Sequence, residues 1–461
     1  MVMGSIPEKV NLAIIGGGVG GYVAAIRAAE LGLSVIIIEK NKMGGHCLNY
    51  ACIPSKTLLH IADIYYKSKN SQIFGIDAEP KINAQKILDW RMGVSEKLEK
   101  GVEFLCNSNG IEIVKGEATF ISSQKLQISN GTEIDFDTAI IATGSVPVEL
   151  KGFEFNDYII DYKKALMLSI IPKTLTIIGG GYVAVELATL YAKLGVSVSI
   201  IARSTVLSHF DSEAVAIIEK SLLNLNVKIY KNAIPETHTQ TSIKLKSGEE
   251  IPHELVVVAV GLRPYTENLG LENTKVTLNE KGFITVGQSL NTTDEKILAI
   301  GDVVGEPMLA HKSMRQGVIA GEVAAGKNSG FDNVVIPAVI FSDPEIGVAG
   351  DVSEKNGVYI KKFPLTALGR AIAMNKTEGF VKVAYDKNKV IKGIEIVSDD
   401  ANAMVAEAAL AIEMGATLED IADTIHPHPT YSEQMQEVAE AGLGRPIHFF
   451  YGKNNEIGKQ T

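Results

Sequence analysis

The most constraining feature of this chain is a strand–turn–helix–strand pattern that occurs twice, about 160 residues apart. In the first copy the apolar run at 10–15 leads into GGGVGG at 16–21, which fits G-x-G-x-x-G. Glycines here permit a tight turn and let the backbone approach a pyrophosphate, which the free N–H groups of the following helix bind. The pattern predicts a dinucleotide site that includes Gly16, Gly18 and Gly21.

The second apolar run of the first copy ends in Glu39, 23 residues after Gly16. An acid at this distance reaches the ribose hydroxyls in dinucleotide-binding units. The alternative is a Gly-rich turn in an α/β domain that binds nothing. Strand, helix, second strand and acid all occur in the required order, so we assign Glu39 to the site.

The second copy begins with the strand pattern at 174–178, followed by GGGYVAVE at 179–186. A helical pattern and another apolar run come next, so Gly179 and Gly181 are expected at a second dinucleotide. A chain that holds two dinucleotides is typical of a redox enzyme that passes electrons between a fixed cofactor and a mobile one.

The second copy departs from the first where the acid is expected, because Ala202 occupies that position and Arg203 follows. An acid would accept a hydrogen bond from a ribose 2′-OH, whereas an arginine can pair with a 2′-phosphate. NAD and NADP therefore both stay open. The alternative is that Arg203 is a solvated surface residue and that NAD binds through the backbone.

Two of the three cysteines, Cys47 and Cys52, lie just after the first nucleotide unit, in GGHCLNYACIPSK. This C-x4-C spacing is not that of a zinc site, and no second cysteine pair completes one. A close dithiol can form a small disulfide ring and take up two electrons, as a flavin and a nicotinamide do. Chance pairing of two structural cysteines is the alternative. Cys106 is expected to be buried in a helix.

This segment resembles the active site of the pyridine nucleotide–disulfide oxidoreductases, and is similar to GGTCLNVGCIPSK of the family's dihydrolipoamide dehydrogenase branch. His46, Tyr50 and Ala51 depart from that form. The resemblance implies that Cys52 is the thiolate that faces the flavin. It implies that Cys47 is the interchange thiol that attacks the substrate.

The resemblance also implies roles for residues of both nucleotide units. Lys56, four residues after Cys52, is expected near the flavin and paired with Glu186; the alternative is an ordinary surface ion pair. Tyr182 replaces the aliphatic residue usual in the dihydrolipoamide branch. Together with Arg203 it resembles glutathione and mercuric reductases, in which this tyrosine covers the flavin until the nicotinamide displaces it.

Further cofactor contacts follow from the resemblance. The ATG segment with Thr143 and Gly144 ends the first nucleotide unit, and ILAIGD with Asp302 resembles the second flavin motif. A buried aspartate with a structural hydrogen bond is the alternative for Asp302. Gly301 and Ala310 are also expected to contact FAD, and Ala310 belongs to an MLAHK run. Gly261 is expected to contact NAD(P).

Near the end of the chain, HPHPTYSE matches the family's acid–base motif. His428 can take a proton from a dithiol substrate near neutral pH, and Glu433 would orient its ring. A core histidine is one alternative. A metal site at His426-x-His428 is another, but no further ligands are suitably spaced, so no metal is expected. In the family this histidine serves the other subunit's disulfide, which implies a homodimer with shared active sites.

We therefore expect an α/β protein with two Rossmann-like domains, for FAD and NAD(P), and a C-terminal α+β dimerisation domain. The expected FAD domain spans 1–146 and 267–335. The NAD(P) domain spans 147–266 and the dimerisation domain spans 336–461.

The charge and the cysteine count exclude several classes. Lys plus Arg is 44 and Asp plus Glu is 54, which gives a net charge of −10. This balance argues against nucleic-acid or membrane binding, and three cysteines argue against a secreted disulfide scaffold. A cytoplasmic enzyme is expected.

The expected activity is FAD-dependent oxidation of dihydrolipoamide to lipoamide, with hydride passing to NAD(P)⁺. The substrate is free, or is carried by a lipoyl domain of a 2-oxoacid dehydrogenase complex. One alternative is an NADPH-dependent reductase of a small, glutathione-like disulfide, which Tyr182 and Arg203 favour. Another is a non-catalytic scaffold subunit, against which the cysteine pair and the His428–Glu433 pair argue.

Overall fold

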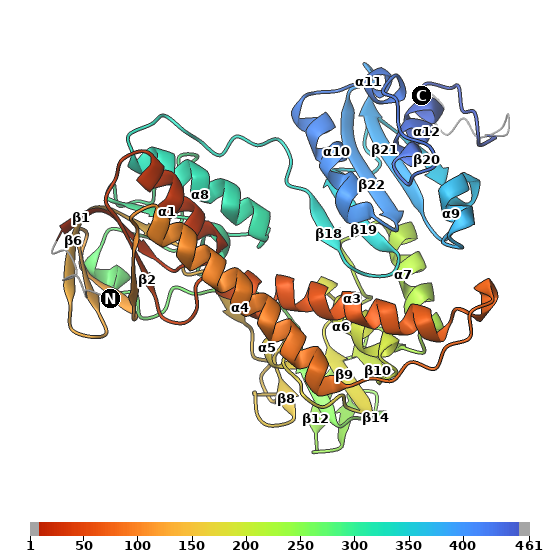
Figure 1. The fold of residues 1–461 in the computed structure, drawn as a ribbon, viewed down its shortest axis with the longest axis horizontal. Helices are drawn as coiled ribbons and strands as arrows, with labels where there is room; N and C mark the ends of the chain where they lie inside the picture. Colours follow the sequence, from red (N-terminus) through yellow and green to blue (C-terminus); the bar gives the residue numbers. More distant parts are fainter. Residues whose placement is uncertain (1–8, 451–461) are drawn as a thin grey trace. The chain divides into compact units, whose positions relative to one another are not determined.

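A computed structural model describes residues 9–450 (Figure 1). The contacts within the chain divide it into two compact units. The first unit runs to residue 172 and includes 255–332; the second unit includes 173–254 and continues from 333. The expected α/β class is confirmed. The three-domain division stays a prediction, and its outermost residues lie outside the described part of the chain.

The first unit is built on a sheet with strand order β3-β2-β1-β6-β5-β4, and β17 also pairs with β6. Its central strands are parallel, whereas β4, β5 and β6 form an antiparallel meander. Residues 12–15 of β1 are all buried, because a parallel strand is covered on both faces. The strands are β1 (Lys9–Ile15), β2 (Val35–Glu39), β3 (Glu112–Lys115), β4 (Ala118–Ser122), β5 (Lys125–Ile128), β6 (Glu133–Ile141) and β17 (Ile297–Ala299).

Helices α1 (Val19–Glu30) and α8 (Ala310–Ala324) lie side by side against this sheet (Figure 1). A Cβ atom on Gly317 of α8 would come within 2.5 Å of the Gly20 carbonyl oxygen of α1. The close crossing of the two helices therefore depends on glycine.

The remaining elements of the first unit include the helices that carry the cysteines. These elements are α2 (Gly45–Tyr50), α3 (Cys52–Lys69), α4 (Ala84–Ser108), α5 (Tyr162–Ala165), β7 (Ser145–Pro147), β8 (Ile159–Ile160), β15 (Leu255–Val258) and β16 (Leu262–Pro264), with 3-10 turns at Gln72–Phe74, Leu271–Asn273 and Gly301–Val304. The expected burial of Cys106 is confirmed, since its side chain is fully buried in α4.

The second unit begins with the second nucleotide pattern. Strands β11, β10 and β9 are parallel neighbours in that order, and β9 covers the residues that the sequence predicts. The elements are β9 (Thr174–Ile178), α6 (Tyr182–Lys193), β10 (Ser197–Ile201), α7 (Ser212–Asn224), β11 (Lys228–Tyr230) and a meander of β12 (Pro235–His238), β13 (Ser242–Leu245) and β14 (Glu250–Pro252).

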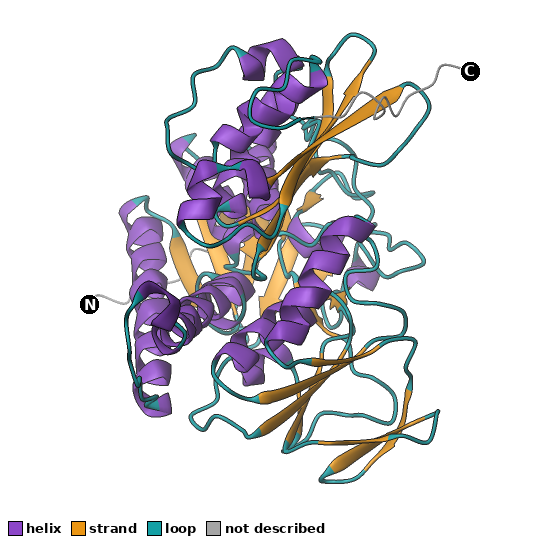
Figure 2. Ribbon diagram, turned by 90° about the vertical axis from the view of Figure 1, so that its right-hand side faces the viewer, coloured by secondary structure: helices purple, strands orange, loops and turns teal. Residues whose placement is uncertain are grey.

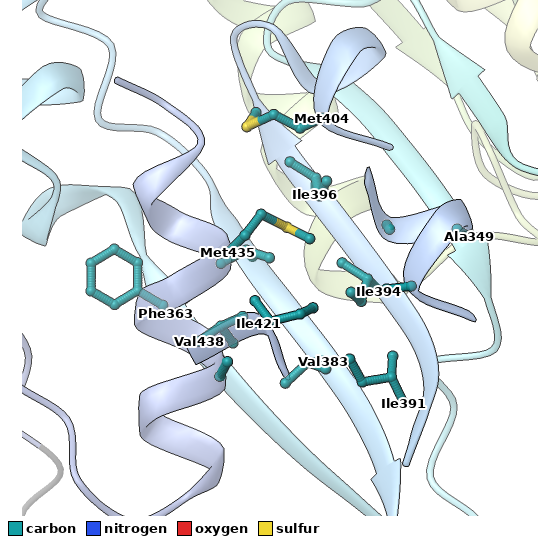
Figure 3. Packing of buried hydrophobic residues seen from close by; sticks show 14 of the residues in the cluster. Ala349, Phe363, Val383, Ile391, Ile394, Ile396, Met404, Ile421, Met435 and Val438 are labelled. Atoms are coloured by element: carbon teal, nitrogen blue, oxygen red, sulfur yellow. The ribbon is translucent and has the colours of Figure 1, made fainter. Parts of the chain in front are cut away.

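The second unit also contains an antiparallel sheet with order β18-β19-β22-β21-β20, which is flanked by helices (Figure 2). Met435 and Val438 of the last helix pack against side chains such as Val383 and Ile394 (Figure 3). The elements are β18 (Ala338–Ile340), β19 (Glu345–Gly350), β20 (Val358–Pro364), α9 (Gly369–Ala373), β21 (Phe380–Asp386), β22 (Ile391–Ser398), α10 (Ala401–Glu413), α11 (Leu418–Ala422) and α12 (Glu433–Gly442), with a 3-10 turn at Leu365–Ala367.

Charged groups join the two parts of the second unit. Lys382 of β21, whose side chain is 9% exposed, pairs with Asp211, the N-cap of α7, at 2.8 Å. Lys193 of α6 pairs with Asp343 at 2.7 Å, and this lysine is also buried. Because few water molecules compete there, these pairs fix the two parts against each other more firmly than exposed pairs would.

Across residues 9–450, no helix combines the length and the apolar character needed to cross a bilayer.

Candidate active site

The first glycine turn has the geometry that a pyrophosphate needs. Gly16 has a φ of 106°, and a Cβ atom there would lie 2.4 Å from the Ala142 carbonyl oxygen. Gly18 is the N-cap of α1, and no side chain caps the helix. The nearest atom to a Cβ on Gly18 would be 4.0 Å away, at Gly45. The uncapped N–H groups and the open approach fit a bound dinucleotide phosphate.

Glu39 stabilises this turn through hydrogen bonds. One carboxylate oxygen accepts a hydrogen bond from the Gly17 N–H at 2.7 Å, and the other accepts one from the Asn41 N–H at 2.7 Å. The residue is half-buried at the end of β2. It therefore lies where the sequence predicts the ribose-binding acid, and it also orders the loop that leads to the cysteines.

The two cysteines come from consecutive helices. Cys47 lies on α2, and Cys52 is the first residue of α3, with Ala51 between the helices. Ala51 has a φ of −134°, so the backbone accommodates the Cβ that distinguishes it from the glycine of related sequences.

Both cysteines are half-buried thiols in direct contact. A hydrogen bond with the Cys52 side chain, together with burial, raises the pKa of the Cys47 thiol, while the positive charge of Lys56 acts in the opposite direction. Lys56 lies one turn after Cys52 on α3, as predicted. This arrangement can form and open a disulfide under the influence of a nearby cation.

Two residues of α4 hold the cysteine-bearing helix, and sequence reasoning missed both. The buried Arg91 donates to the carbonyl oxygen of Asn49 at 2.6 Å, and Ser95 donates to that of Leu48 at 3.1 Å. These carbonyls belong to the last turn of α2, where helices lack internal partners. No local pattern in α4 marks either residue, because their partners lie more than forty positions before them in the chain.

His46, adjacent to Cys47, has a partner that the sequence does not reveal. Its Nε2 atom is hydrogen-bonded to the hydroxyl of Tyr162, at the start of α5, and the two ring centroids are 5.4 Å apart. Burial, reinforced by the charge of Lys163, lowers the pKa of His46 to about 3. The imidazole is thus neutral at physiological pH and ties α2 to α5.

The other FAD contacts predicted in the first unit are linked by hydrogen bonds. Thr143 donates to the carbonyl oxygen of Tyr265 at 2.6 Å, and Ser145 donates to the Asp302 carboxylate at 2.6 Å. Burial raises the pKa of Asp302. The buried Lys312 donates to the Gly305 carbonyl oxygen at 2.5 Å.

Three of the predicted positions are turns or a helix start. Gly144 and Gly301 have φ values of 74° and 81°, which favour glycine, and Ala310 begins α8. The Gly301 N–H donates to the side chain of Gln316 at 2.8 Å. The cofactor-binding assignments of these residues stay predictions.

The second glycine turn is also open. Gly179 has a φ of 138°, and Gly181 is the N-cap of α6, where a Cβ atom would meet nothing within 4 Å among the described residues. Tyr182 begins α6 and is 40% exposed, so it can be contacted by a ligand. Ala202 is buried after β10, whereas Arg203 is exposed. In the first unit, Gly261 has a φ of 133° between β15 and β16.

Glu186 is buried, at 7% exposed, and accepts a hydrogen bond from the Phe341 N–H at 3.1 Å. Lys56 belongs to the first unit and Glu186 to the second, so their pairing stays a prediction.

His428 and Glu433 are paired as the sequence predicts. The His428 Nδ1 atom lies 2.7 Å from a Glu433 carboxylate oxygen, and the other oxygen accepts the Thr430 N–H at 2.8 Å. The His428 side chain is 77% exposed, which leaves Nε2 accessible to a substrate. Because Glu433 begins α12, whose apolar face packs on the sheet, the pair rests on a firmly held helix.

Comparison with known proteins agrees with this geometry. The family model described as pyridine nucleotide-disulphide oxidoreductase matches residues 10–317, and that of the same family's dimerisation domain matches 336–439. A dihydrolipoyl dehydrogenase of Geobacillus stearothermophilus is 43% identical over 466 residues, covering 97% of this chain and 99% of that protein. One of Bacillus subtilis is 39% identical, with 97% and 99% coverage.

Solved structures show the same fold. LpdA from Mycobacterium tuberculosis superposes with a TM-score of 0.87 at 25% identity, covering 94% of this chain and 99% of that one. The HOCl-induced flavoprotein disulfide reductase RclA from Escherichia coli gives 0.85 at 26% identity, with 93% and 99% coverage. The dimerisation-domain match supports a homodimer. This chain belongs to the pyridine nucleotide-disulphide oxidoreductase family.

Proposed function

We propose that this protein oxidises dihydrolipoamide to lipoamide and passes the electrons to a pyridine nucleotide. The observation that carries the proposal is the contact between the Cys47 and Cys52 thiols, on two consecutive helices of which the first begins beside the first glycine turn. Relatives named dihydrolipoyl dehydrogenase match nearly the whole chain, and family membership implies FAD and NAD(H).

The thiol chemistry follows from the residues. His428 takes a proton from the substrate dithiol, and the resulting thiolate attacks Cys47 of the Cys47–Cys52 disulfide. The second substrate thiol then displaces Cys47, which releases lipoamide and leaves both cysteines reduced. The disulfide thus gains the two electrons that the substrate loses. A bound flavin supplies the two-electron carrier between these thiols and the nicotinamide.

The residues around the first turn are those that we propose for FAD. Gly16 and Gly21 permit the tight turn, Gly18 leaves room for the pyrophosphate, and Glu39 lies beside the turn. Lys56 and Asp302 are proposed near the isoalloxazine and the ribityl chain, as the family resemblance implies.

The direct test compares initial rates with dihydrolipoamide plus NAD⁺ or NADP⁺ against rates with NADPH plus glutathione disulfide. We expect turnover of dihydrolipoamide. Glutathione disulfide reduction without lipoamide activity would replace this proposal with the small-disulfide reductase, which the accessible Tyr182 favours.

Cys52→Ser distinguishes an enzyme from a scaffold. We expect the variant to lose at least about a thousandfold in turnover, because no disulfide can form. Cys106→Ala is the control, since this buried thiol lies outside the proposed site. Full activity of the Cys52→Ser protein would contradict the mechanism.

The coenzyme preference is proposed to depend on Arg203, which is exposed two residues after the end of β10, as a 2′-phosphate ligand would be. Arg203→Glu is expected to lower the NADP⁺/NAD⁺ ratio of kcat/KM by about tenfold, because the carboxylate repels a 2′-phosphate. Steady-state kinetics with both coenzymes measure the ratio. If the ratio does not change, Arg203 is only a surface residue.

We further propose that the homodimer shares its active sites and that the dihydrolipoyl group is carried by a lipoyl domain of a 2-oxoacid dehydrogenase complex. Both statements rest on the family resemblance. The proposal of a lipoyl-domain substrate is tested by comparing KM for free dihydrolipoamide with KM for a reduced lipoyl domain. Equal KM values would favour a free substrate.

A further inference from the structure

His426, the first histidine of HPHPTYSE, is held differently from its neighbours. Its side chain is 4% exposed, whereas Ile425 beside it is 93% exposed. The Nδ1 atom lies 2.9 Å from the carbonyl oxygen of Thr424. The Nε2 atom lies 3.0 Å from a carboxylate oxygen of Glu407, on α10. The ring therefore anchors the loop that carries His428 to a helix of the same unit.

The two partners define the protonation state of the ring. A carbonyl oxygen can only accept a hydrogen bond, and an ionised carboxylate can only accept one. With Glu407 ionised, both contacts are hydrogen bonds only when both ring nitrogens carry hydrogen, so this geometry favours the imidazolium form of His426. The hydrogen bond to Glu407 raises the pKa of His426 against the opposing effect of burial, in agreement with this assignment.

This positive charge also acts on Glu433, the carboxylate that holds His428. The charged groups that act on His426 are thus Glu407 from α10 and Glu433 from α12. The hydrogen bond with Glu437, at 2.6 Å, and the negative charge of Glu433 raise the pKa of His448. The acid–base pair therefore lies in the field of a second, buried histidine.

We propose that His426 is a positioning residue for the thiol reaction: its charge, fixed by Glu407, holds the His428 loop and sets the pH range in which the His428–Glu433 pair accepts a proton. The assignment rests on the proposed function, because it concerns the same reaction. It adds to that function a residue that does not touch the substrate.

The direction of the effect follows from electrostatics. A neighbouring positive charge makes the addition of another proton to His428 less favourable and partly offsets the negative charge of Glu433. His428 must be unprotonated to accept the substrate proton. Removing the charge of His426 therefore moves the acidic limb of the dihydrolipoamide oxidation profile to higher pH.

The experiment measures kcat and KM across the range from about pH 5.5 to about pH 9 for the holoenzyme and its variants. His426→Gln is expected to shift the acidic limb upward by roughly half a pH unit to one pH unit. Glu407→Gln is expected to shift it in the same direction, because a neutral partner no longer requires a charged ring. His426→Arg retains the charge and is expected to keep the profile close to that of the unmodified protein.

Arg445→Gln is the matched control, since it removes a cation that pairs with Glu440 on the same helix α12. It is expected to leave the profile unchanged. An unshifted profile in both His426→Gln and Glu407→Gln, or an equal shift in His426→Arg, would overturn the inference. Absence of dihydrolipoamide oxidation in the unmodified enzyme would instead refute the proposed function, so the two failures are distinguishable.

Discussion

At the scale of single residues, burial changes the pKa of Glu395 in the antiparallel sheet. Glu395 of β22 is 1% exposed and lies directly across from Lys382 of β21. One of its carboxylate oxygens is buried without a hydrogen-bond partner, and Lys382 instead pairs with Asp211 and Glu213. Burial, together with the negative charge of Asp211, raises the pKa of Glu395 to about 7.

This shift predicts a stability that falls as pH rises. The pKa of Glu395 is near 4.5 in the unfolded chain and about 7 in the folded one, so the folded state binds the proton more tightly between these values. The contribution of Glu395 to the free energy of unfolding is present below about pH 4.5 and is lost as the pH rises through about 7. Glu395→Gln, which cannot ionise, is expected to be more stable than the parent at about pH 8, by on the order of 3 kcal/mol.

Urea denaturation at about pH 5 and about pH 8 measures the difference. Glu378→Gln is a suitable control, because Glu378 is 62% exposed in its pair with Lys220. An identical pH dependence for the parent and Glu395→Gln would show that Glu395 is ionised in the folded protein throughout.

At the scale of elements, the first glycine turn depends on the absence of side chains. A Cβ atom on Gly21 would lie 1.9 Å from the Gly16 carbonyl oxygen, and backbone atoms cannot move aside as a flexible side chain can. The turn and the first residues of α1 would have to shift together. The proposed pyrophosphate site is formed by the same backbone.

Gly21→Ala is therefore expected to lose bound flavin and to cost about 1–3 kcal/mol in stability. The flavin absorbance per chain after purification and the thermal midpoint measure the two effects. Gly101→Ala is the control, because this glycine lies in α4 with open space around it, and it is expected to stabilise the helix by about 0.5–1 kcal/mol. Full flavin content in Gly21→Ala would contradict the proposed pyrophosphate site.

At the scale of the whole molecule, active sites shared between subunits would let two inactive variants restore activity in a mixed dimer. If His428 of one subunit serves the thiols of the other, Cys47→Ser and His428→Gln homodimers are both inactive. Subunits exchanged between the two variants form heterodimers in which one of the two sites is intact. The mixture is then expected to recover about a quarter of the parent rate.

Activity after mixing, mild unfolding and refolding measures this recovery, and each variant refolded alone is the control. If each site used the His428 of its own subunit, every site in the heterodimer would lack one group. The refolded mixture would then remain inactive.

The order of residues alone was enough to predict the local units. The glycine turns, the parallel strands next to them and the helices that follow were predictable because they depend on residues a few positions apart. Strand β9 has the predicted bounds. The helical spacing of Cys52 and Lys56 and the pairing of His428 with Glu433 are local in the same sense.

The contacts between distant segments depend on the folded chain instead. Tyr162 meets His46 across 116 positions, Ser145 meets Asp302 across 157, and Lys382 meets Asp211 across 171. Hydrophobic periodicity specifies which face of an element is buried, but not which side chain of another element lies against it. The charge states of His46, Glu395 and His426 follow from such contacts and from burial, so they became accessible only once the chain was folded.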